Sequence, residues 1–337
     1  MTMMRRNIWC VIFLVAFMCS CKKSAKSETK PGGDKKPVAA ASFRVVGYLR
    51  EYNVVDGRAI QFDFSKITHL NIAFINPDDK GTFSTLSGLK ELVVAAHAKN
   101  VKVLASIGGG LAPEYYTTLI ADKGSRAKLV GSLASLADQY NLDGIDVDLE
   151  GHFVDANYET FVVELKALLK PKGKLLTTAI ATVYAMQYTD KALAQFDFIN
   201  IMSYDKTGPW KPEKPGQHSP YAMAVDDLAY WGGTRGIAKE KLSLGLPFYG
   251  YGFGSGVPED MAFSDIIKKY HGSEKKDEVT VPEGGTIYYN GLPTIKSKTT
   301  LALQKAGGVM VWQLLQDDAG TNSLLNTIDA EVKAAKK

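Results

Sequence analysis

The chain has 337 residues, of which 45% are hydrophobic and 23% charged, enough for one large domain or two modest ones. Its formal net charge is +4, but residues 1–37 hold eight Lys/Arg and two Asp/Glu, so the remaining residues carry −2. A nearly neutral body gives no electrostatic case for binding nucleic acid, and we expect no nucleic-acid partner.

The chain begins with a pattern typical of an export signal. Arg5 and Arg6 precede an apolar stretch, residues 8–18, that is too short and wrongly flanked for a membrane-spanning helix. The small residue directly before Cys21 resembles a bacterial lipoprotein cleavage site. We therefore expect a signal peptide over residues 1–21 and a lipidated Cys21, giving an exported, membrane-anchored protein that is periplasmic or on the cell surface. Ordinary secretion is the alternative if Cys21 is not lipidated.

A flexible tether is predicted after this signal. Residues 22–37 are rich in Lys, Ser, Gly and Pro and poor in apolar residues. All three cysteines lie in the leader, so the remaining body, residues 38–337, holds neither a disulfide nor a cysteine metal site.

In the body, short apolar runs alternate with helical patterns. Eight runs are predicted as strands: Phe43–Leu49, His69–Ile75, Lys102–Ile107, Gly144–Leu149, Leu175–Ala181, Phe198–Ser203, Leu242–Leu246 and Gly308–Trp312. Helices are predicted over Leu86–Lys99, Ser125–Tyr140, Tyr158–Lys170, Lys191–Phe196, Ala222–Trp231, Ser297–Ala306 and Ser323–Ala335.

This alternation predicts an α/β fold with a parallel sheet, and eight units suit a closed (β/α)8 TIM barrel. A doubly wound open sheet is the alternative. We would expect that fold to have a glycine-rich phosphate loop after its first strand, and residues 47–50 do not have the sequence of such a loop.

The fourth predicted strand carries an unusual acidic face. Asp146, Asp148 and Glu150 alternate with branched apolar residues, and this period of two puts the three carboxylates on one face, about 7 Å apart. A solvated acidic face is the simpler interpretation, although strands are depleted in Asp and Glu. In a barrel the carboxylates would line the lumen, with Glu150 at the C-terminal mouth, where barrel enzymes keep their chemistry. We expect Glu150 to be a proton donor.

Other predicted strands also end in candidate site residues. Glycines follow the third strand, including Gly108 and Gly109, and allow close approach of a ligand or of backbone. Aromatic and polar residues end further strands: Tyr48, Phe74, Met202, Tyr204, Asp205 and Trp312. Singly, each is more often packing, but together they suggest a sugar-binding cleft around the carboxylates.

With these motifs the chain resembles glycoside hydrolase family 18, the chitinase family. The residues that carry the resemblance span about 43–318. They are Asp143-Gly144-Ile145-Asp146-Val147-Asp148-Leu149-Glu150, Ser106-Ile107-Gly108-Gly109, Met202-Ser203-Tyr204-Asp205, Gly208-Pro209-Trp210 and Gly307-Gly308-Val309-Met310-Val311-Trp312.

The resemblance implies retaining hydrolysis of β-1,4 bonds next to N-acetylglucosamine by substrate-assisted catalysis. Glu150 would be the acid and base, while Asp148, sharing a proton with Asp146, would orient the acetamido group of the substrate. Tyr204 would donate a hydrogen bond to the acetamido oxygen. Trp312 would form the floor of the reacting subsite. Further substrate-binding residues would be Tyr48, Phe74, Gly108, Gly109, Met202, Asp205 and Trp210.

The sequence departs from the family pattern in two places. Many chitinases carry an Arg soon after Gly-Leu-Pro-Phe-Tyr-Gly, where this chain has Tyr251. Only about 50 residues separate Gly254 from Gly307, so we expect a reduced insertion between strands seven and eight, over residues 256–290, with a hairpin near 286–289. A shallower cleft would favour soluble oligosaccharides or glycans over crystalline chitin.

Other functions remain open at this point. An endo-β-N-acetylglucosaminidase acting on the N-glycan core is one, and a non-catalytic glycan-binding protein is another. A metal site formed by the carboxylates is a further alternative, but His152 is the single histidine near them in sequence. A histidine on such a loop is more often solvated than a metal ligand. We expect no metal, no cofactor and a monomer, with an N-acetylglucosamine-containing glycan and the membrane as partners.

Overall fold

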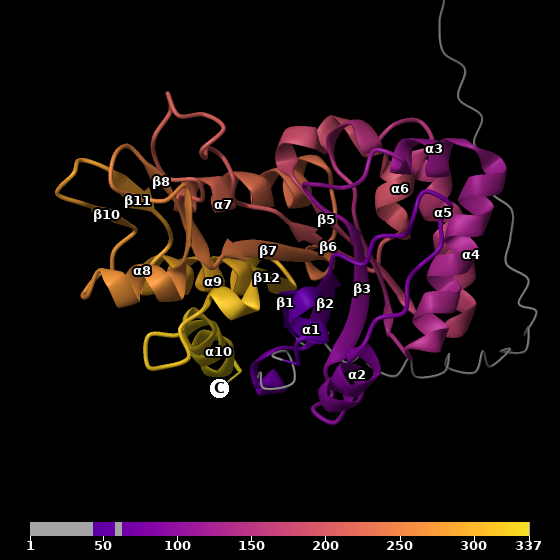
Figure 1. Cartoon of the computed structure of the whole chain (residues 1–337), viewed down its shortest axis with the longest axis horizontal. Coiled ribbons are helices and arrows are strands. Elements are labelled where there is room, and N and C mark those ends of the chain that lie inside the picture. Colours follow the sequence, from indigo (N-terminus) through magenta and orange to yellow (C-terminus); the bar gives the residue numbers. More distant parts are fainter. Residues whose placement is uncertain (1–42, 58–62, 337) are drawn as a thin grey trace, which may run out of the picture. The chain divides into compact units, whose positions relative to one another are not determined.

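Eight parallel strands form a closed barrel in the computed structural model, which describes residues 43–57 and 63–336 (Figure 1). The order around the barrel is β1, β12, β7, β6, β5, β4, β3, β2. The strands are β1 Arg44–Arg50, β2 His69–Ala73, β3 Lys102–Gly108, β4 Gly144–Asp148, β5 Leu175–Ile180, β6 Phe198–Ile201, β7 Leu242–Pro247 and β12 Gly308–Trp312. These correspond to the eight predicted strands, so the TIM-barrel prediction is confirmed.

The predicted signal peptide (1–21), the lipidation of Cys21 and the tether (22–37) lie outside the described residues. Within residues 43–57 and 63–336, none of the helices combines the length and the apolar character needed to cross a bilayer.

Helices connect the strands on the outside of the barrel. They are α1 Tyr52–Val55, α2 Leu89–His97, α3 Tyr116–Ala121, α4 Lys123–Gln139, α5 Tyr158–Leu169, α6 Asp190–Gln195, α7 Tyr221–Leu228, α9 Leu292–Lys305 and α10 Leu324–Ala334. Side-chain caps fix several of their starts: Asp122 accepts from the Ser125 N–H before α4, and Ser323 accepts from the Asn326 N–H before α10.

The two faces of β4 serve two different cores. Ile145, Val147 and Leu149 are fully buried in the layer between barrel and helices. The lumen holds a smaller cluster, made of Val46, Tyr48, Ala73, Phe198, Tyr204 and Met310. The alternation of β4 therefore points its acidic face into the lumen, as a period of two requires.

A small antiparallel sheet is inserted between β7 and β12, in the order β10-β11-β8-β9. Its strands are β8 Tyr249–Phe253, β9 Asp260–Ala262, β10 Glu278–Thr280 and β11 Thr286–Tyr288, with α8 Phe263–Lys269 after β9 (Figure 1). The predicted hairpin is the β10–β11 pair. The sheet begins earlier than the predicted boundary of 256, because β8 follows β7 directly and pairs with both β9 and β11.

Candidate active site

The three carboxylates of the acidic stretch follow one another from the lumen to the mouth of the barrel. Asp146 and Asp148 belong to β4 and are 0% and 4% exposed, whereas Glu150 lies just beyond the strand and is partly exposed. This arrangement leaves the upper carboxylate open to a ligand and the lower two shielded from water.

Asp146 is held by hydroxyl groups from three different strands. Tyr48 donates to Asp146 Oδ2 at 2.6 Å, Ser106 donates to the same oxygen at 2.7 Å, and Thr177 donates to Oδ1. Burial raises the pKa of Asp146, and these hydroxyl donors oppose that rise. The lowest carboxyl group is thus an anchored acceptor with a fixed position.

Asp148 differs, because its Oδ1 is buried and has no hydrogen-bond partner among the described residues. Burial raises the pKa of Asp148 well above its usual range, and the charges of Glu150 and Asp146 raise it further. A protonated Asp148 can donate a hydrogen bond, and its partnerless oxygen is available to a ligand.

Glu150 has the electrostatic properties of a general acid. Burial, followed by the negative charge of Asp205, raises the pKa of Glu150 to about 7. Burial contributes more to this rise than the neighbouring negative charge does. A carboxylic acid with this pKa is substantially protonated near neutral pH, which a proton donor requires.

Tyr204 and Asp205 follow β6, which is separated from β4 by β5 in the barrel. Gly245 makes room for the Tyr204 ring, since a Cβ there would lie 2.9 Å from it. Tyr204 is 8% exposed, and burial raises the pKa of its hydroxyl, which therefore remains a donor. Asp205 adopts a positive φ of 61° and accepts a hydrogen bond from Tyr249 at 2.5 Å.

Aromatic rings lie beside the carboxylates. Trp312, at the end of β12, lies 5.5 Å from Phe74 and 5.5 Å from Tyr48, measured between ring centroids. A Cβ on Gly109 would collide with Phe74, and one on Gly108 would collide with the Asp148 carbonyl. These two glycines therefore make space for the protein itself: Gly109 for the Phe74 ring and Gly108 for the β4 backbone.

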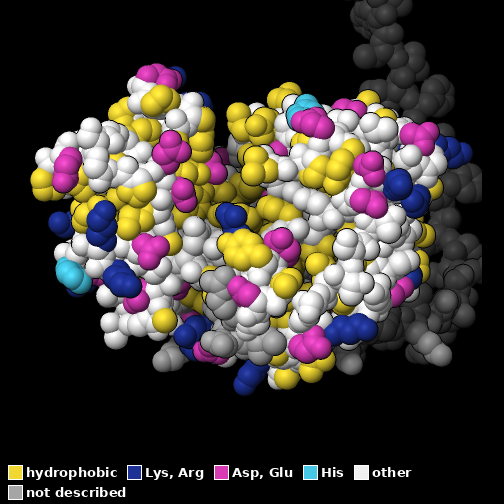
Figure 2. Space-filling view, in the orientation of Figure 1, with side chains coloured by type: hydrophobic (Ala, Val, Ile, Leu, Met, Phe, Trp, Pro, Cys, Tyr) yellow, Lys and Arg dark blue, Asp and Glu magenta, His cyan; other side chains and the backbone are white. Residues whose placement is uncertain are grey.

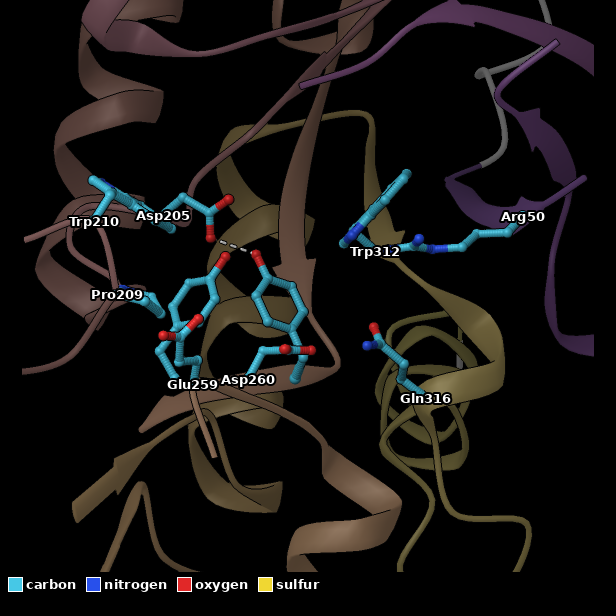
Figure 3. A pocket seen from close by; sticks show the side chains of 10 residues that line it. Arg50, Asp205, Pro209, Trp210, Glu259, Asp260, Trp312 and Gln316 are labelled. Atoms are coloured by element: carbon cyan, nitrogen blue, oxygen red, sulfur yellow. Dashed lines mark hydrogen bonds between the residues drawn. The ribbon is translucent and has the colours of Figure 1, made fainter. Parts of the chain in front are cut away.

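A pocket of about 410 Å³ opens next to Trp312 (Figure 3). It is lined by Arg50, Asp205, Pro209, Trp210, Tyr249, Tyr251, Glu259, Asp260, Trp312 and Gln316. Asp205 and Trp210 lie on one side, and Arg50 and Trp312 lie on the other. Figure 2 shows that this face is hollowed and that hydrophobic side chains line the hollow. Aromatic walls with a few charged groups suit a sugar chain.

Comparisons with known proteins agree with this geometry. The family described as "Glycosyl hydrolases family 18" matches residues 44–317. The chain belongs to this family. A solved GH18 chitinase, ChiB of Flavobacterium johnsoniae, is 36% identical with a TM-score of 0.80, covering 88% of this chain and 96% of its own. A solved chitinase of Bacteroides thetaiotaomicron is 29% identical with a TM-score of 0.74, covering 86% and 96%. "Probable chitinase 2" of Drosophila melanogaster is 26% identical, over 93% of this chain and 78% of its own length.

The family 18 chain has pocket residues that sequence reasoning did not select. Tyr249, Tyr251, Glu259 and Asp260 all come from the inserted sheet or its loops. Arg50 is the last residue of β1, and its Cζ lies 5.7 Å from the centroid of the Trp312 ring. For Tyr251, the sequence shows only that it stands where many chitinases carry an Arg. Strand alternation predicts that Thr177 faces the lumen and could therefore have identified it as a site residue. No pattern in the sequence predicts that Glu259 lines the pocket.

Within the described residues of this family member, no cluster of three or more His, Cys, Asp or Glu side chains is arranged to hold a metal ion. His152, the nearest histidine in sequence, contacts Glu114 instead, with 3.0 Å between Nε2 and Oε2.

Proposed function

We propose that the chain is a retaining glycoside hydrolase that cleaves β-1,4-linked N-acetylglucosamine oligosaccharides by substrate-assisted catalysis. The observation that carries the proposal is the acidic column. Asp148 has a raised pKa, and its Oδ1 has no partner in the part of the chain that the structure describes; it lies between an anchored Asp146 and a Glu150 whose pKa is about 7. Asp146 is a fixed acceptor, Asp148 offers a polar group that can bind the acetamido group of the substrate, and Glu150 is a proton donor. The reaction requires these roles.

The first step would cleave the glycosidic bond. Glu150 gives its proton to the bridging oxygen, so the leaving sugar departs as an alcohol. The acetamido oxygen of the substrate attacks the anomeric carbon and forms an oxazolinium ion. Asp148 holds the acetamido nitrogen, and the protonated hydroxyl of Tyr204 stabilises the oxygen.

The second step would return the site to its starting state. Glu150, now a carboxylate, takes a proton from a water molecule, which attacks the anomeric carbon on the face left by the leaving sugar. The bond between that carbon and the acetamido oxygen breaks, which restores the acetamido group and leaves Glu150 protonated. Two displacements at one carbon restore its original configuration. Asp146 keeps its three hydroxyl donors throughout and so holds the lower end of the column in place.

Hydrolysis of a chitotriose reporter tests this function, with glycan release from an N-glycosylated protein measured in parallel. We expect turnover of the reporter and little release of glycan. The opposite pattern would favour an endo-β-N-acetylglucosaminidase. Binding of the oligosaccharide without turnover would favour a glycan-binding protein, but the presence of Glu150, Asp148 and Tyr204 together speaks for catalysis.

We also propose that the protein is an exported lipoprotein that acts as a monomer. The support is Cys21 behind an apolar leader and before the lysine-rich residues 22–37. Lipid labelling in cells should be lost in Cys21→Ala, and the chain should then be recovered in the soluble exported fraction. Labelling that persists in Cys21→Ala would contradict the anchor.

A further inference from the structure

Away from the acidic column, one lysine side chain is completely buried. Lys298, on α9, is 0% exposed. Its Nζ donates to the Ser219 carbonyl oxygen at 2.6 Å, to Ser219 Oγ at 2.7 Å and to Asn290 Oδ1 at 2.7 Å. All three acceptors are neutral. Burying an ammonium group is costly, so this arrangement calls for a reason.

The contacts of Ser219 lead from Lys298 to the proposed active site. Ser219 Oγ donates to the Ser203 carbonyl at 2.6 Å, and Ser203 immediately precedes Tyr204. The neighbouring His218 carbonyl accepts from the Lys206 N–H at 2.9 Å. Residues 218 and 219 therefore bond the chain on both sides of Tyr204 and Asp205.

The turn at these residues needs such support. Asp205 has a φ of 61°, a backbone conformation that residues other than glycine seldom adopt. Among the described residues, the Tyr204 hydroxyl makes one hydrogen bond, a weak one donated to Met310 Sδ at 3.7 Å, which does not fix its direction strongly. Its position depends on the backbone that carries it.

The same segment is also bonded to the inserted sheet. Asn290 Nδ2 donates to the Ser219 carbonyl at 2.9 Å, and Gln217 Nε2 donates to the Tyr289 carbonyl at 2.9 Å. Lys298 thus lies where α9, residues 217–219 and the end of the insertion meet. The insertion in turn supplies Tyr249, which donates to Asp205.

We propose that Lys298 is a positioning residue that places Tyr204 and Asp205 through Ser219 and couples their geometry to the inserted sheet. The inference rests on the proposed function, since it assigns Lys298 to the same reaction. Lys298 itself does not touch the substrate.

The three acceptors require the charged form of the lysine. Three oxygens lie 2.6–2.7 Å from Nζ, and Ser219 Oγ already donates its own proton to the Ser203 carbonyl, so a neutral amine would turn its lone pair toward one of these oxygens. Only an ammonium supplies three donors. Burial lowers the pKa of Lys298 to about 7, and the charges of Asp277 and Asp227 act to raise it.

Two variants test the proposal. Lys298→Met removes the three donors at similar volume, and Ser219→Ala removes the link to Ser203 with little change in volume. Lys305→Met, at the exposed end of α9, is the matched control. For each, kcat and KM are measured on the chitotriose reporter. Affinity is measured for chitotriose and for a bicyclic thiazoline that mimics the oxazolinium ion.

We expect each variant to lower kcat by about tenfold to 10²-fold, because small misplacements of catalytic groups have effects of this size. KM and chitotriose affinity should change little, while thiazoline affinity should fall with kcat. The two variants combined should lose no more than the worse one alone. Lys305→Met should behave as wild type.

A purely structural role would lower the melting temperature and weaken both ligands equally, and this result would overturn the proposal. So would wild-type kcat in Ser219→Ala, the variant that decides the question if Lys298→Met does not fold.

A wild-type chain without turnover would contradict the proposed function instead. The inference would then be decided by crystal structures, in which Ser219→Ala should displace the Tyr204 hydroxyl and an unmoved hydroxyl would refute it.

Discussion

The barrel lumen and the pocket beside it are built in opposite ways. In the lumen, Asp146 is 0% exposed and bonded by hydroxyls from β1, β3 and β5. In the pocket, Trp210 is 53% exposed, and several walls come from the inserted sheet and the loops at the barrel mouth. The lumen is preorganised and buried, whereas the pocket is open to solvent.

This difference assigns the two regions different tasks. Preorganised groups in a water-excluded site stabilise charge that develops in a reaction, whereas exposed aromatic surfaces contribute to binding. Substitutions in the lumen should therefore change kcat, and substitutions in the pocket should change KM. The predictions below test this division from the largest expected effect to the smallest.

Glu150→Gln should have the largest effect, because it removes the proton that the leaving oxygen needs. We predict a fall in kcat of about 10²- to 10⁴-fold with little change in the dissociation constant for chitotriose, measured by calorimetry. Glu91→Gln, on the exposed side of α2, is the control and should keep full activity. Near-wild-type turnover in Glu150→Gln would disprove its role as the acid.

Tyr204→Phe removes a hydroxyl from the lumen side of the site. Loss of a hydrogen bond to a charged group corresponds to about 1.5–3 kcal/mol, or roughly 10- to 100-fold in kcat. Tyr158→Phe is the matched control, since the Tyr158 hydroxyl is likewise buried, has no hydrogen-bond partner among the described residues, and packs on the helix side. Equal losses in the two variants would mean that the Tyr204 effect is not specific to the site.

Trp210→Ala should act on binding. Stacking of a sugar on this exposed ring is worth about 1 kcal/mol, or roughly fivefold in KM, with kcat nearly unchanged. Tyr52→Ala, at an exposed aromatic on α1 that does not line the pocket, should leave both constants unchanged. A fall in kcat at constant KM would contradict the division between lumen and pocket.

The pH profile should show the smallest but most specific effect. Glu150 must be protonated to act, and its pKa is raised to about 7, so kcat/KM should fall as pH rises through about 7. Asp205→Asn removes a charge that raises this pKa, so the alkaline limb should move to lower pH. Asp260→Asn, in the same pocket, should not move it. If kcat/KM of Asp205→Asn falls at the same pH as that of the wild type, the fall cannot be assigned to Glu150.

The barrel and the acidic column could be predicted from the sequence because both follow from periodicity. Alternation along residues 144–150 specifies which side chains share a face, and eight strand-helix units specify the closure that turns that face inward. The same reasoning located Tyr204 and Trp312, since parallel strands end at one rim.

The rest of the site depends on tertiary contacts that have no local pattern. Glu259 and Asp260 reach the pocket only because β8 folds back on β9, and their short strand has no distinctive alternation. Lys298 looks like any helix lysine in sequence, because its acceptors, Ser219 and Asn290, come from other segments. The sequence predicts Glu150 as a proton donor, but the burial that raises the pKa of Glu150 is a property of the folded barrel.

The anomeric form of the first product tests the central claim most directly. The wild-type enzyme is added to an N-acetylglucosamine oligomer, and the new reducing end is followed by proton NMR before it equilibrates in water. Substrate-assisted catalysis through the column of Asp146, Asp148 and Glu150 predicts that the β-anomer appears first. An initial α-anomer would show inversion and would contradict a mechanism in which the substrate supplies the nucleophile.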